Sequence, residues 1–179
     1  MSKTELLKKL KPIDYELVSE LIKNSRLSDR QVAKKMNVSQ PTVTRRRGEL
    51  EKQRLFDYTA IPDLAKLGFE ILAFTFGKWR LEMVSDQKIE AAKAFLSRHP
   101  NVIFVSTGGG MGFDRVAVSF HRNYSDYSLF MKELKEDWEP FLGLPETFIV
   151  SLQSDNILRN LTFKYLAELF KKENAQQKT

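Results

Sequence analysis

The sequence contains no cysteine and only two histidines, His99 and His121. Without cysteine the chain forms no disulfide and uses no thiolate as a nucleophile or metal ligand. Two histidines are too few to predict a dedicated metal site, so we expect neither a metal nor another cofactor. No apolar run approaches the roughly 18 residues that a membrane-spanning helix needs. The N-terminus carries lysines but no apolar signal core, so we expect a cytoplasmic protein with no membrane partner.

Excess positive charge is absent from two thirds of the chain. The formal net charge is +6, and residues 1–60 hold 14 Lys and Arg against 8 Asp and Glu. Residues 61–179 hold 15 of each and are neutral overall. This asymmetry predicts a basic module for a polyanion, joined to a neutral module with another task. The alternative interpretation is a chance distribution in a lysine-rich chain.

The basic third contains signals for successive short helices. Pro12 opens a stretch in which apolar residues recur at helical spacing up to Ile22. A second helix is predicted from Ser28, whose capping box with Gln31 satisfies free N–H groups. A third is predicted from Ser39, after a turn in which Asn37 suits the left-handed conformation. Two capped helices around a short turn predict a helix-turn-helix, with double-stranded DNA as the partner.

The third helix, within residues 39–53, is expected to pack through Val43 and Leu50 and to expose its opposite face. That exposed face is rich in hydroxyl, amide and guanidinium groups, which read base edges and phosphates. Arg47 falls on the inner stripe, where we expect its stem to pack and its head to extend outward. The alternative is an ordinary solvated helix surface. The predicted DNA-binding residues are Ser39, Gln40, Thr42, Thr44, Arg45, Arg46, Arg47 and Lys52.

The remaining residues alternate between strand and helix patterns. A short strand is expected at 57–61, and the main pattern runs strand, helix, strand, strand, helix, strand between Glu70 and Ser154. This order predicts a ferredoxin-like βαββαβ domain. Both helices would cover one face of the sheet and leave apolar residues around Phe74 on the other. An uncovered apolar face predicts a partner subunit, hence a homodimer.

The fold class is therefore predicted as α+β, with a winged-type helix-turn-helix domain before a ferredoxin-like one. The expected divisions are a DNA-binding domain (1–56), a linker strand and turn (57–68), a βαββαβ domain for ligand sensing and oligomerisation (69–155) and a C-terminal helix (156–179). We assign no role to that last helix.

From Ile13 to about Leu67 the chain resembles the Lrp/AsnC family of leucine-responsive, feast/famine transcription regulators. The matching segments are IDYELVSELIKNSRLSDRQVAKKMNVSQPTVTRRRGELEKQRLF and YTAIPDLAKLGF. The resemblance continues more loosely through the second domain. It implies a RAM-type domain that pairs into dimers, which assemble into larger even-numbered oligomers. The family has an aliphatic residue where Arg47 stands and a basic residue where Gly48 stands.

A glycine-rich hairpin, GGGMGF, joins the two central strands. A phosphate cradle is one interpretation, but such loops lead from a strand into a helix, and this one leads into a strand. A flexible hairpin is the plainest interpretation. The resemblance implies a third, an amino-acid effector bound near the hairpin at a subunit interface. Its implied contacts are Gly108, Gly109, Gly110, Gly112 and Asp114.

Two rival functions stay open at this point. Tetrapyrrole-modifying decarboxylases have a similar two-domain layout and would use His99, His121 and Arg122 around a porphyrin. A metabolite sensor whose helix-turn-helix contacts only protein is the second rival. The sequence favours a DNA-binding regulator that is not an enzyme.

Overall fold

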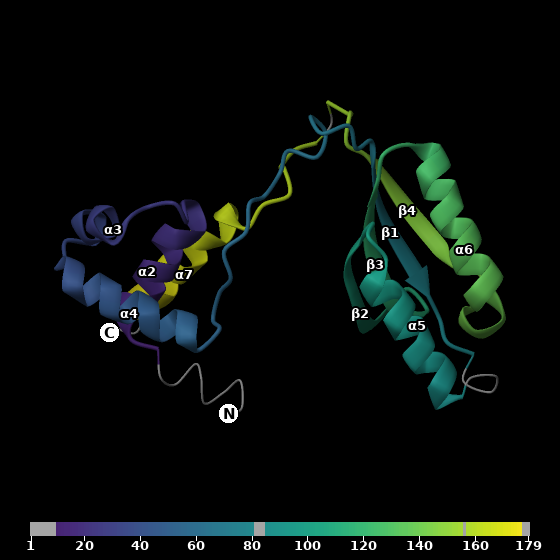
Figure 1. Cartoon of the computed structure of the whole chain (residues 1–179), viewed down its shortest axis with the longest axis horizontal. Helices are drawn as coiled ribbons and strands as arrows, with labels where there is room; N and C mark the ends of the chain where they lie inside the picture. Colours follow the sequence, from purple (N-terminus) through teal and green to yellow (C-terminus); the bar gives the residue numbers. More distant parts are fainter. Residues whose placement is uncertain (1–9, 81–84, 156, 177–179) are drawn as a thin grey trace. The chain divides into compact units, whose positions relative to one another are not determined.

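A computed structural model of the chain describes residues 10–80, 85–155 and 157–176, with the backbone alone described at 137–142 and 172–176. The chain divides into two compact units (Figure 1). One unit comprises residues 1–61 and 159–179, and the other comprises residues 62–158. Each unit is described by itself below.

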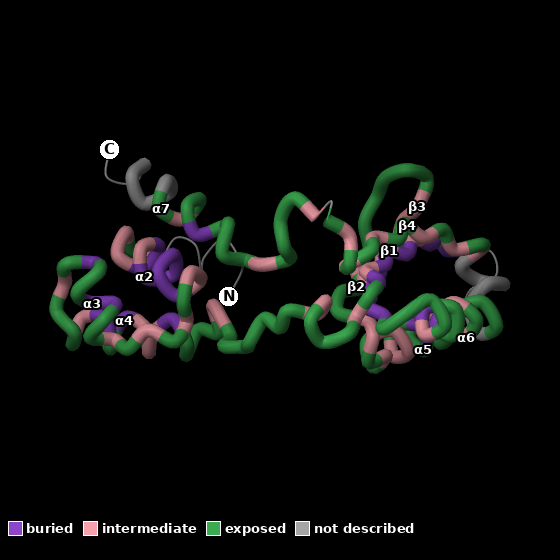
Figure 2. Tube along the Cα trace, turned by 90° about the horizontal axis from the view of Figure 1, so that it is seen from above, coloured by how far each residue is buried: buried purple, intermediate pink, exposed green. Residues whose placement is uncertain are grey.

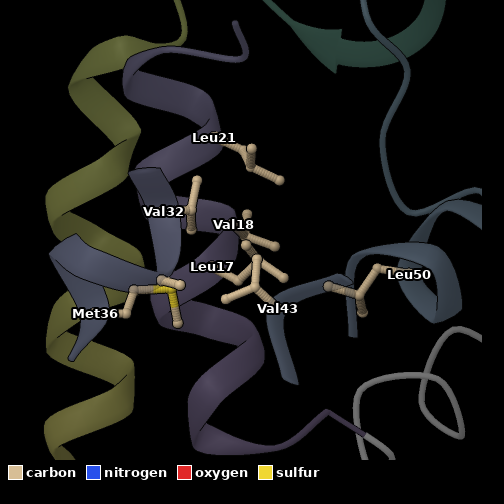
Figure 3. Close-up of a cluster of buried hydrophobic side chains, with 8 residues drawn as sticks. Leu17, Val18, Leu21, Val32, Met36, Val43 and Leu50 are labelled. Carbon is tan, nitrogen blue, oxygen red and sulfur yellow. The ribbon is translucent and has the colours of Figure 1, made fainter. Parts of the chain in front are cut away.

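The first unit is built on three helices: α2 (Pro12–Lys23), α3 (Asp29–Met36) and α4 (Gln40–Lys52). Their apolar faces converge on one core (Figure 3). Its buried members are Leu17, Val18, Leu21, Val32, Ala33, Met36, Val43 and Leu50. The predicted inner face of the third helix is confirmed, because Val43 and Leu50 are 1% and 0% exposed.

The C-terminal segment belongs to the same unit. The 3₁₀ turn η2 (Lys164–Leu166) leads into α7 (Ala167–Gln176), which packs beside α2. Ser19 in α2 is fully buried, and its hydroxyl donates to the carbonyl oxygen of Ala167 at 2.8 Å. Phe170 packs against the three-helix core. The helix without an assigned role thus completes the helix-turn-helix unit.

The strand expected at 57–61 is wrong: the structure has an extended coil there with no strand pairing. Side chains hold this coil instead, because the Tyr58 hydroxyl donates to Glu51 in α4 at 2.6 Å. The turn expected next is present at residues 64–68, and it ends at Gly68 with a φ of +83°. A positive φ of this kind favours glycine.

The second unit is a four-stranded antiparallel sheet with two helices. Its elements are β1 (Ile71–Gly77), α5 (Asp86–Arg98), β2 (Val102–Gly110), β3 (Phe113–His121), α6 (Tyr124–Leu142) and β4 (Glu146–Ser151). The strand order is β2-β3-β1-β4, with all neighbours antiparallel. The predicted βαββαβ fold is confirmed.

Both helices lie on one side of the sheet, so its two faces differ (Figure 2). On the helix-facing side Ala73 and Ser119 are cross-strand partners and both are fully buried. On the other side Phe74 pairs with Phe148, whose side chain is 66% exposed. Strand alternation therefore puts small residues under the helices and leaves an apolar face uncovered.

No helix within the described part of the chain is both long enough and apolar enough to cross a membrane.

Candidate nucleic-acid interface

Local hydrogen bonds cap the starts of α3 and α4, and a left-handed residue ends α3 in the turn between them. The backbone N–H of Gln31 donates to the Ser28 hydroxyl at 3.3 Å, and the Ser28 N–H donates to the Gln31 side chain at 2.9 Å. Asn37 ends α3 with φ 53° and ψ 46°, the left-handed conformation. The Ser39 hydroxyl then accepts from the N–H of Thr42 at 3.3 Å. The capped turn predicted from the sequence is confirmed.

The outer face of α4 presents several of the predicted DNA-binding residues to solvent. The Arg45 side chain is 59% exposed, and it donates to Glu49 one turn later at 2.7 Å. An exposed pair of this kind contributes little to stability and exchanges readily for a phosphate. Thr42 is half-buried. The exposed members of the face are Ser39, Gln40, Thr44, Arg45 and Lys52.

Arg46 does not belong to this exposed face, which corrects the prediction. Its side chain is 8% exposed, and its Nε donates to Asp14 Oδ1 at 2.7 Å. A second hydrogen bond runs from Nη2 to the other carboxylate oxygen, and Nη1 donates to Glu49. The hydrogen bond to Asp14 raises the pKa of Arg46. Arg46 therefore ties α4 to α2 inside the unit.

Arg47 is also engaged within the protein, so the expectation that its head extends outward is wrong. Its guanidinium contacts Asp29 of α3 at 3.0 Å and Glu51 at 3.1 Å. It also donates to the Tyr58 hydroxyl at 2.8 Å and lies 5.0 Å from the centre of that ring. Burial and the hydrogen bond to Glu51 raise the pKa of Tyr58 to about 12, so the phenol stays protonated at neutral pH. Arg47 thus holds the coil after α4 in place.

Asp29 joins the two helices of the motif. Besides contacting Arg47, its carboxylate accepts from the Thr44 hydroxyl at 2.7 Å. The Thr44 side chain stays exposed, with its methyl group and a hydroxyl lone pair available to a partner. Asp29 therefore orients Thr44, one of the predicted DNA contacts.

Sequence reasoning missed two exposed cations on α3, Arg30 and Lys34. They lie four residues apart, which puts them on one helix face. No ion pair engages either side chain within the described ranges 10–80, 85–155 and 157–176. The four-residue spacing of like charges in the first helix of the motif was the signal that could have revealed them.

The structure does not gather the predicted effector residues into a glycine loop. Gly108, Gly109 and Gly110 lie in β2, which corrects the expected loop, and the turn consists of Met111 and Gly112 with φ of 52° and 82°. β2 is an edge strand, so one side of its backbone is unpaired. The carboxylate of Asp114 already accepts from the N–H of Trp79 at 3.3 Å.

The three residues of the tetrapyrrole hypothesis have structural partners. His121 is fully buried, between the Ser119 hydroxyl at 2.8 Å and the Asn101 amide at 3.1 Å. Burial lowers the pKa of His121, which favours the neutral ring. His99 packs edge-on against Phe130. The guanidinium of Arg122 lies 5.0 Å from the centre of the Phe69 ring.

Comparison with known proteins connects the motif to regulators. A model of winged helix-turn-helix DNA-binding domains matches residues 10–55. The chain is 38% identical over 84 residues to an uncharacterized HTH-type transcriptional regulator of Pyrococcus abyssi, covering 46% of this chain and 56% of that protein. It is 33% identical over 97 residues to the HTH-type transcriptional regulator LrpC of Bacillus subtilis, covering 54% and 64%. The matches therefore span less than two thirds of the length of these curated relatives.

Solved structures have the same fold over 84–90% of this chain. LrpC superposes with a TM-score of 0.68 over 84% of this chain and 99% of its own, at 24% identity. The transcriptional regulator NMB0573 of Neisseria meningitidis, solved with L-Met, gives a TM-score of 0.75 over 90% and 99%, at 18% identity. At these identities the superpositions establish a common fold.

Proposed function

We propose that this chain is a sequence-specific DNA-binding transcription regulator of the Lrp/AsnC family, as the winged helix-turn-helix match, the similarity to LrpC and the fold shared with LrpC and AsnC support. The observation that carries the proposal is the exposed face of α4, which stands on the buried Val43 and Leu50 and follows a doubly capped turn. A helix held this way presents its first turns to a DNA major groove. The enzyme hypothesis is not supported by the partners of its candidate residues.

Each exposed side chain of this face suits a particular contact. Arg45 fits a guanine edge or a phosphate, and Gln40 fits the edge of an adenine. The methyl group of Thr44 fits a thymine methyl, since the hydroxyl is oriented by Asp29. Arg30 and Lys34 of α3 fit phosphates beside the groove.

The experiment begins by enriching genomic fragments bound by the full chain and ends with a salt titration on the best fragment. We expect Arg45→Ala to weaken binding and to reduce the slope of log K against log salt by about one, because one phosphate contact is lost. Lys132→Ala is the matched control: like Arg45 it lies in an exposed ion pair four residues from its carboxylate, but in α6. For Lys132→Ala, the slope of log K against log salt should equal that of the wild type.

Two results would contradict the proposal. If no fragment were enriched over input DNA, the helix-turn-helix would be a protein contact and the metabolite-sensor hypothesis would stand. If the Arg45 variant kept the wild-type affinity and slope, the exposed face of α4 would not be the DNA contact.

We further propose a homodimer, or a larger even-numbered assembly, formed through the uncovered sheet face. The support is the apolar character of that face, on which Phe74, Val118 and Phe148 are neighbours across three strands. Exposed apolar surface of this extent is usually buried against a partner. A two-fold assembly would present two α4 helices to two-fold related half-sites in DNA.

We also propose an amino-acid effector near the β2–β3 hairpin. The L-Met bound to the Neisseria meningitidis neighbour supports an effector of this class. In this chain the unpaired edge of β2 around Gly109 offers backbone N–H groups to a carboxylate. Repeating the DNA titration in the presence of each member of an amino-acid panel tests this proposal. An effector should shift the DNA affinity of the wild type, and Gly109→Val should remove that shift.

A further inference from the structure

The second unit contains a cavity that the DNA-binding activity does not use. It has a volume of about 400 Å³ and lies between the helix-facing side of the sheet and helices α5 and α6. Small residues create the space: Thr75, Gly77 and Ala117 line it from the strands, and Ala92 lines it from α5. A volume of this size is within the usual range for sites that bind small molecules, roughly 300–1,000 Å³.

The walls of this cavity are largely apolar. Ile89 and Leu96 of α5, Leu134 of α6 and Val105 of β2 all line it, together with the indole ring of Trp79. Trp79, Ala92 and Leu134 form one buried cluster. Apolar cavities of this kind hold water poorly and accept apolar molecules of matching size. The body of a ligand would therefore be a hydrocarbon or an aromatic ring.

One polar group in the wall lacks a partner. Trp79 is 7% exposed, and its Nε1–H makes no hydrogen bond with any described residue. Leaving such a buried donor unpaired costs about 1–3 kcal/mol, so native proteins rarely do so. The backbone N–H of Trp79 does have a partner, Asp114. The unpaired indole N–H indicates that a ligand supplies an acceptor.

The charges around the cavity have one sign. Lys93 and Arg115 line it, and no Asp or Glu is among the described residues of its wall. Lys93 pairs with Glu90, and Arg115 lies near Asp114, but neither carboxylate lines the cavity. The guanidinium carbon of Arg115 lies 5.8 Å from the centre of the Trp79 ring. A carboxylate placed between them could accept one hydrogen bond of about 2.9 Å from the indole N–H of Trp79 and another from the guanidinium of Arg115.

From these four observations we infer that the cavity binds a small carboxylic acid with an apolar or aromatic body and no ammonium group. The body fills the space over Ala92 and Ala117, and the carboxylate accepts from Trp79 Nε1–H and pairs with Arg115. An ammonium group would meet two cations and no carboxylate in this wall, so a free amino acid fits poorly. The site lies within one subunit and is distinct from the hairpin proposed above for an amino-acid effector.

Calorimetric titration of the full chain tests the inference without DNA. The probes are phenylacetate, its neutral analogue phenylacetamide, and phenylglycine, which adds an ammonium group on the carbon between the ring and the carboxylate. We expect saturable binding of phenylacetate and about tenfold weaker binding of the other two, because an acceptor charge is worth a tenfold factor or more in such a site. The chain has two tryptophans, so two indole N–H signals are expected in an ¹⁵N spectrum. Phenylacetate should shift the one that Trp79→Phe removes.

Variants localise the binding. Trp79→Phe keeps an aromatic ring and removes the donor, and Arg115→Gln removes the cation; each should weaken phenylacetate binding about tenfold. Lys132→Gln, an exposed cation of the same unit, should leave the affinity unchanged. Ala117→Leu fills the cavity and should abolish binding; should it fail to fold, the Trp79 and Arg115 variants suffice. The inference is overturned if phenylacetate does not saturate, if phenylacetamide binds equally tightly, or if Trp79→Phe and Arg115→Gln both keep the wild-type affinity.

Discussion

At the scale of single residues, Asp14 decides what Arg46 of α4 does. Its side chain is fully buried, and its carboxylate accepts both from the backbone N–H of Lys11 at 2.6 Å and from Arg46. A buried carboxylate needs such partners, because removal from water is otherwise costly. Arg46 therefore neutralises a carboxylate in the first turn of α2, while its neighbour Arg45 remains exposed.

We expect Arg46→Ala to lower the free energy of unfolding by about 3–5 kcal/mol, because it leaves the Asp14 charge buried without its partner. Urea denaturation measures the effect. Arg45→Ala should change stability by less than about 0.5 kcal/mol, since its ion pair is exposed. The double variant Asp14→Leu with Arg46→Met should recover much of the loss. A stable Arg46→Ala variant with weakened DNA binding would instead place Arg46 at the DNA.

At the scale of elements, α7 is the helix that completes the first unit. Glu20 of α2 is 8% exposed and lies near lysines of three helices: Lys23 at 3.9 Å, Lys35 at 3.4 Å and Lys171 at 3.7 Å. A hydrogen bond with Glu168 raises the pKa of Lys23. The charged pairs frame an apolar contact in which Ala167 is fully buried. The helix-turn-helix thus depends on a segment from the far end of the chain.

Removing the aromatic ring of α7 should show this dependence. We expect Phe170→Ala to destabilise the first unit by about 2 kcal/mol, less than for a fully buried ring because Phe170 is half-buried. Thermal unfolding measures it, with a fall in Tm of several degrees. Leu169→Ala, 54% exposed on the same helix, is the control and should have little effect. Equal losses from both variants would mean that α7 contributes only its own helical structure.

At the scale of the whole molecule, the two units carry different surface features. The first carries the charge excess and the exposed face of α4, and the second carries the apolar sheet face and the cavity. The sheet face cannot be covered by α5 and α6, which both lie on the opposite side. Covering it with a second copy would also supply the symmetry that paired DNA half-sites require.

We expect Phe148→Lys to shift the protein from dimer toward monomer in sedimentation velocity, because it places a charge in the centre of a buried apolar contact. Phe148 is 66% exposed within the subunit, so the variant should keep its fold. Leu129→Lys provides the comparison, since Leu129 is a similarly exposed apolar residue on α6. A Phe148→Lys protein that sediments like the wild type would show that the sheet face is not the interface.

Much of the fold followed from the sequence because its signals are local. The caps at Ser28 and Ser39 and the left-handed Asn37 act within three residues, so the helix-turn-helix was predicted with its boundaries. Alternation and helical spacing gave the βαββαβ order in the same way. The strand expected at 57–61 failed because pairing needs a neighbouring strand, and the coil is held by Tyr58 instead.

The sequence by itself determined the helix-turn-helix, the order of the sheet domain and the segregation of charge, since each depends on residues a few positions apart. Tertiary structure decided which arginine of the run Arg45, Arg46 and Arg47 faces solvent, because the partner of Arg46 lies 32 residues away in α2. It also decided that α7 joins the helix-turn-helix unit, through a contact between residues 148 positions apart in the chain. The cavity beside Trp79 has the same origin, because its small residues meet only when α5 packs on the sheet.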